Sequence, residues 1–226
     1  MSPSNYSSAW DHEPTRAAWT KHMVMNILGQ IGWTVAYPGL FYVMVVFTSQ
    51  AFVFVFLPFI LYSLYRFFVQ LTYFPWAFRM RRVLQEYPWQ LLKGVPSGLG
   101  KYPGASDDGM WFEFRNPARF EEKIPMVFIK HQRSYWWMKR LEGPRTKAHR
   151  RAQIEPLWFA GDPRFLAVVA APARGGEAPK RLHLLYQRPV FDHRSASEAW
   201  EANSADTERA RRAGAKHPET TSQRSA

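Results

Sequence analysis

Residues 23–73 read MVMNILGQIGWTVAYPGLFYVMVVFTSQAFVFVFLPFILYSLYRFFVQLTY, and this stretch decides the fold of the chain. From Met23 to Val69 it carries one full charge, Arg66, among Phe, Val, Leu, Ile, Tyr and Met side chains. About 20 apolar residues are enough to cross a bilayer core about 30 Å thick, so the stretch is long enough for two crossings. We therefore predict a transmembrane hairpin over residues 23–75.

Three topologies compete for this stretch. A helical hairpin could turn at Thr48, Ser49 and Gln50; a single helix could cross the membrane once; or a hairpin could turn at Pro38 and Gly39, a strong turn dipeptide. The last two place the polar side chains of residues 48–50 near the bilayer centre, where they are costly. The first is favoured because it puts them at the far interface, and the turn at Pro38 and Gly39 stays open as an alternative.

Pro38 and Pro58 lie on opposite sides of the favoured turn, at similar expected depth in the membrane. Proline is tolerated in spanning helices and commonly kinks them, so both residues are candidate transmembrane kinks. Asn26, Gly29 and Gly32 in the first leg favour close helix contact in lipid. The contact is expected with the second leg, and a homo-oligomer is the alternative.

Basic residues set the expected orientation of the anchor. The turn is uncharged, and both flanks are basic, with Arg16 and Lys21 before the anchor and Arg79, Arg81 and Arg82 after it. By the positive-inside tendency we expect a multi-pass protein of the cell membrane with both termini in the cytoplasm. Arg66 is close enough to the cytoplasmic end for its side chain to snorkel toward that interface.

Composition excludes some chemistry and suggests a partner. The 226 residues carry a formal net charge of +12 and no cysteine, which excludes disulfides, thiol nucleophiles and Cys-based metal sites. Of the 30 lysines and arginines, only Arg16, Lys21 and Arg66 precede residue 79. A basic domain tethered to a membrane faces anionic lipid first, and the tether disfavours nucleic acid.

The segments around the anchor differ in composition. Residues 1–22 are predicted to be a cytoplasmic leader, and residues 76–93 a juxtamembrane helix. Residues 94–109 are rich in Gly, Pro and Asp and are predicted to be a linker. Residues 191–226 are polar and are predicted to be a disordered tail, with a weak helix at residues 197–213.

Residues 110–190 have the pattern of a cytoplasmic β-domain. Five runs are rich in aromatic and β-branched residues, some with strict alternation. These runs cover residues 110–115, 125–131, 154–160, 164–171 and 180–187. The predicted fold class is therefore α+β: a two-helix transmembrane hairpin followed by a small antiparallel β-domain, either a five-stranded sheet or a partly open barrel.

The candidate site is the basic and aromatic stretch of residues 130–151, which holds eight Lys or Arg and one acid, Glu142. Clustered cations beside Trp suit anionic headgroups, at about 1 kcal/mol for each basic residue near the surface. They also suit nucleic acid. In the alternative interpretation the tryptophans pack in the core and the charges solvate a loop. The predicted lipid or partner surface comprises Lys130, Arg133, Trp136, Trp137, Lys139, Arg140, Arg145, Lys147, Arg150 and Arg151.

No catalytic residue, metal ligand or cofactor is predicted. The histidines lack metal-ligand spacing, and His183 is expected on the polar face of its strand. Asp107, Asp108 and Asp162 have the context of turn residues, since Asp162 precedes a proline. An enzyme is therefore the least supported class of function.

Two segments support a resemblance. Residues 133–140, RSYWWMKR, and residues 154–164, IEPLWFAGDPR, resemble uncharacterised integral membrane proteins of actinomycetes. The resemblance implies a membrane setting and no particular activity. A spanning hairpin followed by a small β-domain is also similar to bacterial membrane proteins with pleckstrin-homology-like modules, a likeness of architecture that does not deliver function.

Two hypotheses of function follow. The first is a membrane-tethered scaffold or adaptor, whose basic β-domain engages anionic lipid headgroups or an unidentified protein partner at the inner leaflet. The second is an accessory subunit of a larger membrane complex, for transport or secretion, that binds through its hairpin.

Overall fold

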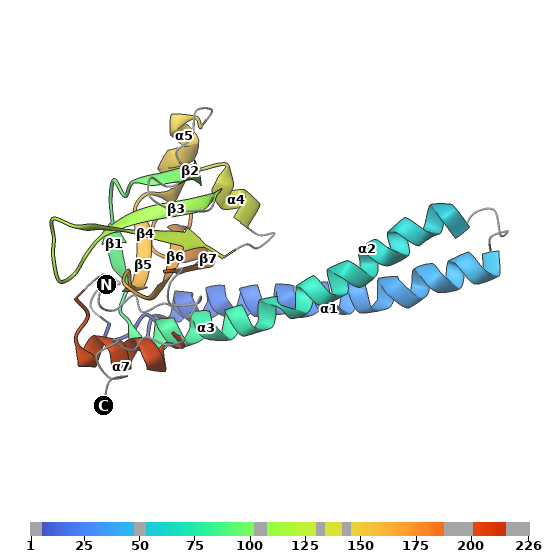
Figure 1. Ribbon diagram of the computed structural model, residues 1–226, viewed down its shortest axis with the longest axis horizontal. Helices are drawn as coiled ribbons and strands as arrows, with labels where there is room; N and C mark the ends of the chain where they lie inside the picture. The colour runs from blue at the N-terminus through green and yellow to red at the C-terminus, as the bar shows by residue number, and fades with distance from the viewer. Residues whose placement is uncertain are drawn as a thin grey trace, which may run out of the picture. The chain divides into compact units, whose positions relative to one another are not determined.

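The computed structural model describes residues 6–47, 53–101, 108–129, 134–141, 146–187 and 201–215. The chain is α+β and divides into two units. Residues 20–78 form a helical unit, and residues 1–19 together with 79–226 form the unit that contains the sheet. From here on the second unit is termed the β-domain (Figure 1).

Three helices account for the apolar part of the chain. They are α1 (Glu13–Phe47), α2 (Val53–Leu71) and α3 (Tyr73–Glu86). Two candidate spans, Glu13–Phe47 and Val53–Glu86, are long and apolar enough to cross a membrane. Helices α1 and α2 run side by side as a hairpin (Figure 1).

Contacts between α1 and α2 establish an antiparallel register. Gln70 Nε2 donates a hydrogen bond to the backbone oxygen of Asn26 at 3.0 Å. The rings of Trp33 and Tyr62 meet edge-on, with centroids 5.7 Å apart. Both contacts pair residues at roughly equal distances from the gap between the two helices, so the chain reverses direction there.

The position of the reversal decides between the predicted turns. Helix α1 continues through Pro38 and Gly39 to Phe47, so the alternative turn at Pro38 and Gly39 is wrong. The antiparallel register also excludes one continuous spanning helix. The favoured turn, at residues 48–50, falls in the gap between α1 and α2 and lies outside the described residues.

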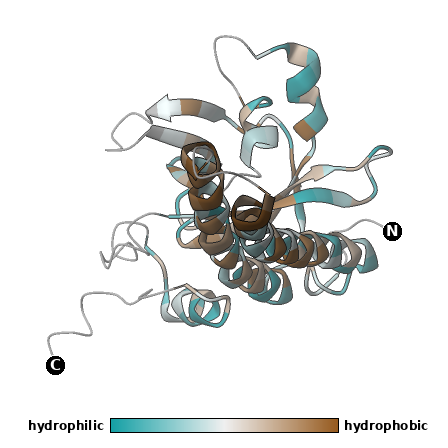
Figure 2. Ribbon diagram, turned by 90° about the vertical axis from the view of Figure 1, so that its right-hand side faces the viewer, coloured by the Kyte–Doolittle hydropathy of each residue, from teal (hydrophilic) through white to brown (hydrophobic). Residues whose placement is uncertain are grey.

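The hairpin exposes apolar side chains and buries polar ones, which is the opposite of the pattern in a soluble protein. Large apolar side chains on its surface are exposed, among them Val45 at 62% and Phe54 at 81%. The buried positions include Asn26, Arg66 and Gln70. Figure 2 shows the brown of both helices against the teal of the polar elements. In hydrocarbon this arrangement is expected, because apolar side chains face lipid and polar ones pack between helices.

The β-domain is built on one curled antiparallel sheet in the order β1-β5-β6-β7-β4-β3-β2. Five of its strands match the predicted runs. The seven strands are β1 (Gln90–Leu92), β2 (Ser97–Lys101), β3 (Asp108–Arg115), β4 (Lys123–Phe128), β5 (Leu157–Asp162), β6 (Leu166–Pro172) and β7 (Pro179–Tyr186).

The prediction of five strands was wrong because β1 and β2 have weak sequence patterns. Strand β1 has three residues and lies directly after α3, within residues 76–93. Strand β2 lies within residues 94–109, where glycine suggested a linker. Gly98 is required in β2 because a Cβ there would come within 2.2 Å of the Trp111 ring on β3.

The two faces of the sheet are covered differently. Phe112, Phe114, Phe159 and other apolar side chains fill the inner face of the curl. On the outer face, Trp158 stacks on His12 with ring centroids 5.7 Å apart, and burial lowers the pKa of His12.

The N-terminal residues are fastened to the β-domain by polar contacts as well. Trp89 Nε1 donates a hydrogen bond to Thr15 Oγ1 at 2.8 Å, and the backbone N–H of Ala9 donates to the carbonyl of Tyr87 at 2.8 Å. Part of the predicted leader, residues 6–15, therefore belongs to the β-domain.

His183 does not lie on a polar face. Residues 182–185 are all buried, because both faces of β7 are covered. His183 Nε2 lies 3.3 Å from the carbonyl oxygen of Ile129, and burial lowers the pKa of His183 to about 4. The prediction was wrong because alternation identifies a polar face only when one side of a sheet meets solvent.

Part of the predicted disordered tail is a docked helix, as the weak helix in that segment suggested. Helix α7 (Ser204–Arg212) starts with a capping box between Asn203 and Asp206. Asp206 also forms an ion pair with Arg164 at 2.8 Å, and Arg164 is paired with the buried Asp162 at 2.6 Å. Asp162 is thus more than a turn residue, since it helps to attach α7.

Candidate functional site

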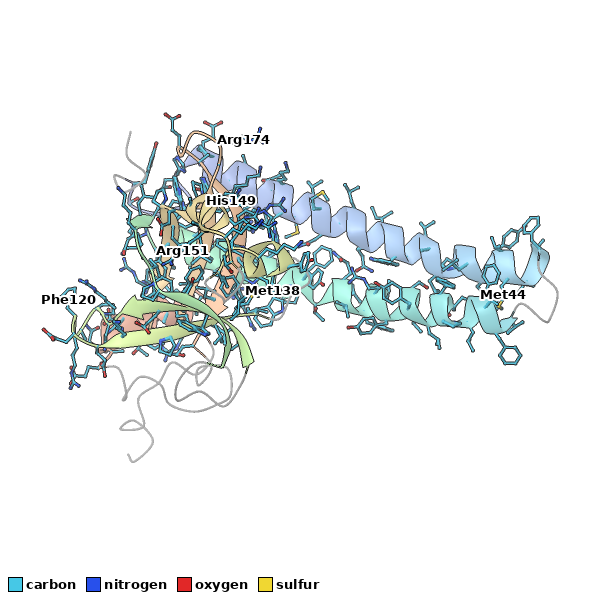
Figure 3. All side chains as sticks on the ribbon, turned by 90° about the horizontal axis from the view of Figure 1, so that it is seen from above. Met44, Phe120, Met138, His149, Arg151 and Arg174 are labelled. Carbon is cyan, nitrogen blue, oxygen red and sulfur yellow. The ribbon has the colours of Figure 1, made fainter. Side chains whose placement is uncertain are left out.

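The described part of the predicted basic stretch forms short helices. They are α4 (Tyr135–Met138), α5 (Ala148–Arg151) and a 3-10 turn, η4 (Ala152–Ile154). Figure 3 labels Met138 on α4 and His149 and Arg151 on α5, while Phe120 projects from the tip of the β3–β4 hairpin at another end of the domain.

The two adjacent tryptophans have different roles. Trp137 is 1% exposed and lies against Phe112 and Phe128, with centroids 6.1 and 5.7 Å away. Its Nε1 donates a hydrogen bond to the backbone oxygen of Arg181 at 3.2 Å. Trp137 is therefore a core residue that anchors α4, and the sequence interpretation in which it packs inside holds for this residue.

Trp136 is half-buried and has two arginines over its ring. The guanidinium carbon of Arg140 is 3.8 Å from the centroid of the Trp136 ring, and that of Arg181 is 5.6 Å from it. Trp136 also meets Trp137 edge-on at 5.3 Å, which holds its ring in place. We term Trp136, Arg140 and Arg181 the Arg–Trp–Arg stack.

The Arg140 side chain is held in one orientation. Its Nε donates to Gln153 Oε1 and its Nη1 to the backbone oxygen of Trp136, both at 2.9 Å. Burial, and then repulsion by Arg150 and Arg181, lower the pKa of Arg140. The guanidinium of Arg140 nevertheless stays charged, because the pKa of arginine is far above physiological pH. Arg140, Arg150 and Arg181 therefore form a cluster of positive charge.

Arg181 joins this site through an irregularity in strand β7. The register between β6 and β7 shifts at Val169 and Ala171, and Arg181 has a φ of 60°. Lys180 and Arg181 are consequently both exposed, where regular alternation would bury one of them. Bulges of this kind re-aim side chains. Arg181 was not among the predicted site residues, because no sequence pattern marks where a ladder slips.

The other predicted surface residues are distributed around this stack. Lys139 lies over the Tyr135 ring, with Nζ 4.3 Å from the centroid. Lys147 and Arg150 are exposed and Arg151 is half-buried. Lys130, Arg133 and Arg145 lie outside the described residues. Among residues that the structure describes, no carboxylate forms an ion pair with Arg140, Arg150 or Arg181.

Pro38 and Pro58 lie inside α1 and α2, and neither helix ends at its proline. The antiparallel register of the hairpin places them at similar levels, as predicted from their distance to the turn.

Two further observations concern metal binding and a buried ion cluster. Over the described ranges, no group of three or more His, Asp or Glu residues could hold a metal ion. The ion cluster of Asp162, Arg164 and Asp206 was not predicted, because its acids are far apart in the chain. Arg164 is 4% exposed, so this cluster attaches α7 and offers little to a ligand.

Comparisons with protein-family models, curated proteins and solved structures found nothing that matches this chain.

Proposed function

We propose that this protein is a membrane-anchored binding module of the inner face of the cell membrane. The hairpin of α1 and α2 crosses the bilayer twice, and the β-domain engages the phosphates of anionic lipid headgroups through its Arg–Trp–Arg stack. The observation that carries the proposal is this stack, in which Arg140, held by two hydrogen bonds, and Arg181 both lie over the ring of the half-buried Trp136.

The stack has the chemistry that an anionic headgroup requires. Guanidinium groups bind phosphate oxygens through pairs of N–H donors, and tryptophan is at home at the membrane interface. Arg140 is already oriented by Gln153 and the Trp136 carbonyl, so little side-chain entropy remains to be lost on binding. A bound phosphate would also relieve the repulsion between Arg140 and its cationic neighbours.

The inside-out polarity of the hairpin supports the anchor. The orientation of the anchor is supported by the contacts that residues 6–15 make with residues after the hairpin. Residues before and after the hairpin must then share one compartment. An even number of crossings meets that condition. Basic flanks on both sides of the anchor favour the cytoplasm as that compartment.

The lipid proposal is tested on the full chain in nanodiscs. A nitroxide spin label is attached to an Ala148→Cys variant, on α5 beside the stack. With phosphatidylglycerol present, we expect the label to enter the headgroup region, as measured by its accessibility to a lipid-soluble relaxant. With phosphatidylcholine alone, we expect the label to stay in water.

The matched variants separate this site from general charge. Arg140→Gln with Arg181→Gln removes two charges from the stack, and Arg115→Gln with Arg211→Gln removes two elsewhere on the β-domain. The first pair should abolish the lipid response and the second should largely retain it. Equal responses in both pairs, or a label that ignores phosphatidylglycerol, would refute headgroup binding and leave a protein partner as the ligand of this surface.

A further inference from the structure

The contact between α1 and α2 contains a polar seam, which consists of Asn26, Gln30, Arg66 and Gln70. One part of it is satisfied within the hairpin, since Gln70 donates to the Asn26 carbonyl. Gly29 makes room for this contact, because a Cβ there would lie 3.0 Å from Gln70 Nε2. The seam is therefore a packed feature of the hairpin.

Other atoms of the seam are left without partners. Asn26 is fully buried, and neither its Nδ2 nor its Oδ1 forms a hydrogen bond with any described residue. The same holds for Nε and Nη1 of Arg66, which is 8% exposed. The guanidinium carbon of Arg66 lies over the ring of Trp33, 5.1 Å from its centroid. Buried polar groups, and charges above all, are normally paired.

The counter-charge for Arg66 must come from outside the hairpin. The sequence contains no Asp or Glu between Glu13 and Glu86. A second copy of the hairpin brings no acid either, so self-association leaves the charge uncompensated. This argues against the homo-oligomer considered from the sequence, and for a different molecule that carries an acid.

The direction of the Arg66 side chain indicates where that acid lies. Its guanidinium lies over Trp33, toward the end of the hairpin where α1 ends and α2 begins, termed here the closed end. Snorkelling would instead carry the guanidinium past Gln70 toward the opposite, open end. Side chains on a helix lean toward its N-terminus, and the N-terminus of α2 is at the closed end. The expected snorkelling of Arg66 is therefore not what the structure has.

Depth distinguishes a protein carboxylate from a lipid phosphate. Arg66 lies about 20 Å along α2 from Val53, at 1.5 Å per residue. With the closed end at the far interface of a core about 30 Å thick, Arg66 starts about 10 Å below the near boundary. Lipid phosphates lie at that boundary, and the guanidinium of Arg66 points away from it.

We propose that Arg66 pairs within the bilayer with the carboxylate of an Asp or Glu on a transmembrane helix of another protein. The inference rests on insertion of the hairpin, proposed above, and is independent of headgroup binding by the β-domain. It makes this chain one component of a hetero-oligomeric membrane complex.

The probe for this site is a synthetic transmembrane helix of Leu and Ala with one Glu at the depth of Arg66. A matched peptide carries Gln at that position. Association with the full chain in phosphatidylcholine vesicles is measured by energy transfer to a dye on a Ser222→Cys variant. We expect the Glu peptide to bind about tenfold more tightly than the Gln peptide, the size of effect that polar contacts between membrane helices supply.

Variants make the result specific. Arg66→Met should remove the preference for Glu, Arg66→Glu should transfer it to a peptide that carries Lys, and Lys21→Met should leave it unchanged. Resistance to an alkaline carbonate wash shows that each variant is inserted, so a failed insertion is told apart from a failed pairing. Equal binding of the two peptides to the inserted protein would overturn the proposal. So would a preference that phosphatidylglycerol abolishes, since it would assign the site to lipid phosphate.

Discussion

At the scale of single residues, His183 shows how burial changes an ionisable group. The ring lies beside Phe128, with centroids 4.8 Å apart, and is buried. Its pKa of about 4 means that the folded β-domain holds the ring neutral at ordinary pH. The unfolded chain takes up a proton more readily, so acid favours unfolding.

His183→Gln should make stability less dependent on pH. In the natural sequence, the free energy of unfolding should fall by up to roughly 3 kcal/mol as pH drops from about 6.5 to about 4. The variant should lose this part of the slope, while His12 retains a smaller part. Urea unfolding of the full chain in detergent, followed by tryptophan fluorescence, measures the effect. His149→Gln, on exposed α5, serves as the control, and an identical slope in all three proteins would contradict the assignment.

Arg181 carries backbone strain at the candidate site. A non-glycine residue at a φ of 60° costs roughly 1 kcal/mol. Arg181→Gly should therefore raise the free energy of unfolding and, at the same time, weaken the response to phosphatidylglycerol. Arg181→Gln should weaken the lipid response without the gain in stability. Such a trade of stability against binding is measured by the unfolding and spin-label experiments, and a glycine variant no more stable than the glutamine variant would count against it.

Residue identity in the candidate site was only partly predictable. The sequence placed Trp136 and Trp137 side by side with the cations, and both interpretations, surface and core, turn out to apply to one tryptophan each. A helix of one turn directs neighbouring side chains to different faces, so composition alone could not separate them. The contribution of Arg181 depends on a register shift between two strands, which is a tertiary feature.

At the scale of elements, periodicity predicted five strands because those strands are long and rich in aromatic and β-branched residues. Strand β1 and the glycine-rich β2 were missed because pairing with β5 and β3, and not propensity, makes them strands. Helix α7 was foreseen as weak, and its attachment depends on Arg164, which is distant in sequence.

Arg164→Met should loosen α7 and destabilise the β-domain. It leaves the carboxylate of Asp162 buried without its cation, which typically costs about 3–5 kcal/mol. Arg211→Met removes an exposed pair with Glu208 on α7 itself and should cost about 0–1 kcal/mol. Hydrogen exchange of residues 204–212, read by mass spectrometry, should rise strongly in the first variant and little in the second. Equal protection in both would mean that other contacts hold α7.

Gly98→Val should detach β2 from β3. The added side chain would collide with the Trp111 ring, and overpacking of this kind costs about 1–3 kcal/mol. Gly109→Ala is the matched control, because a Cβ at Gly109 in β3 meets nothing within 4 Å. The melting temperature of the full chain in detergent and the exchange of residues 97–101 distinguish the two. A Gly98→Val variant that melts at the same temperature as the natural sequence would show that Trp111 can move aside.

At the scale of the whole molecule, the two long apolar helices were the most predictable part of the chain. Side chains that face hydrocarbon must be apolar, and the composition of a segment shows directly whether it meets this requirement. The contact of Asn26 and Gly29 with the second helix was predicted and is present, whereas the burial of Arg66 and Gln70 beside them was not predicted, because it depends on which helix faces meet. Figure 3 shows Met44 near the closed end of the hairpin, where the chain would reach the far side of the membrane.

The absence of cysteine permits a direct test of topology. Single cysteines at Ser4, Ser49 and Ser222 in the full chain are exposed to a membrane-impermeant maleimide on intact cells. We expect labelling at Ser49→Cys alone, and labelling of all three after the membrane is made permeable. Labelling of either terminal position on intact cells would refute a double crossing with both ends in the cytoplasm.

The packing of residues 6–15 on the sheet has a consequence for biogenesis. These residues precede the hairpin in the chain, whereas Trp89 and Trp158, which contact Thr15 and His12, follow it. The contacts of residues 6–15 with the rest of the β-domain can therefore form only after the whole hairpin has been synthesised. A nascent chain halted before β5 would therefore lack Trp158 and leave the His12 ring without this stacking partner.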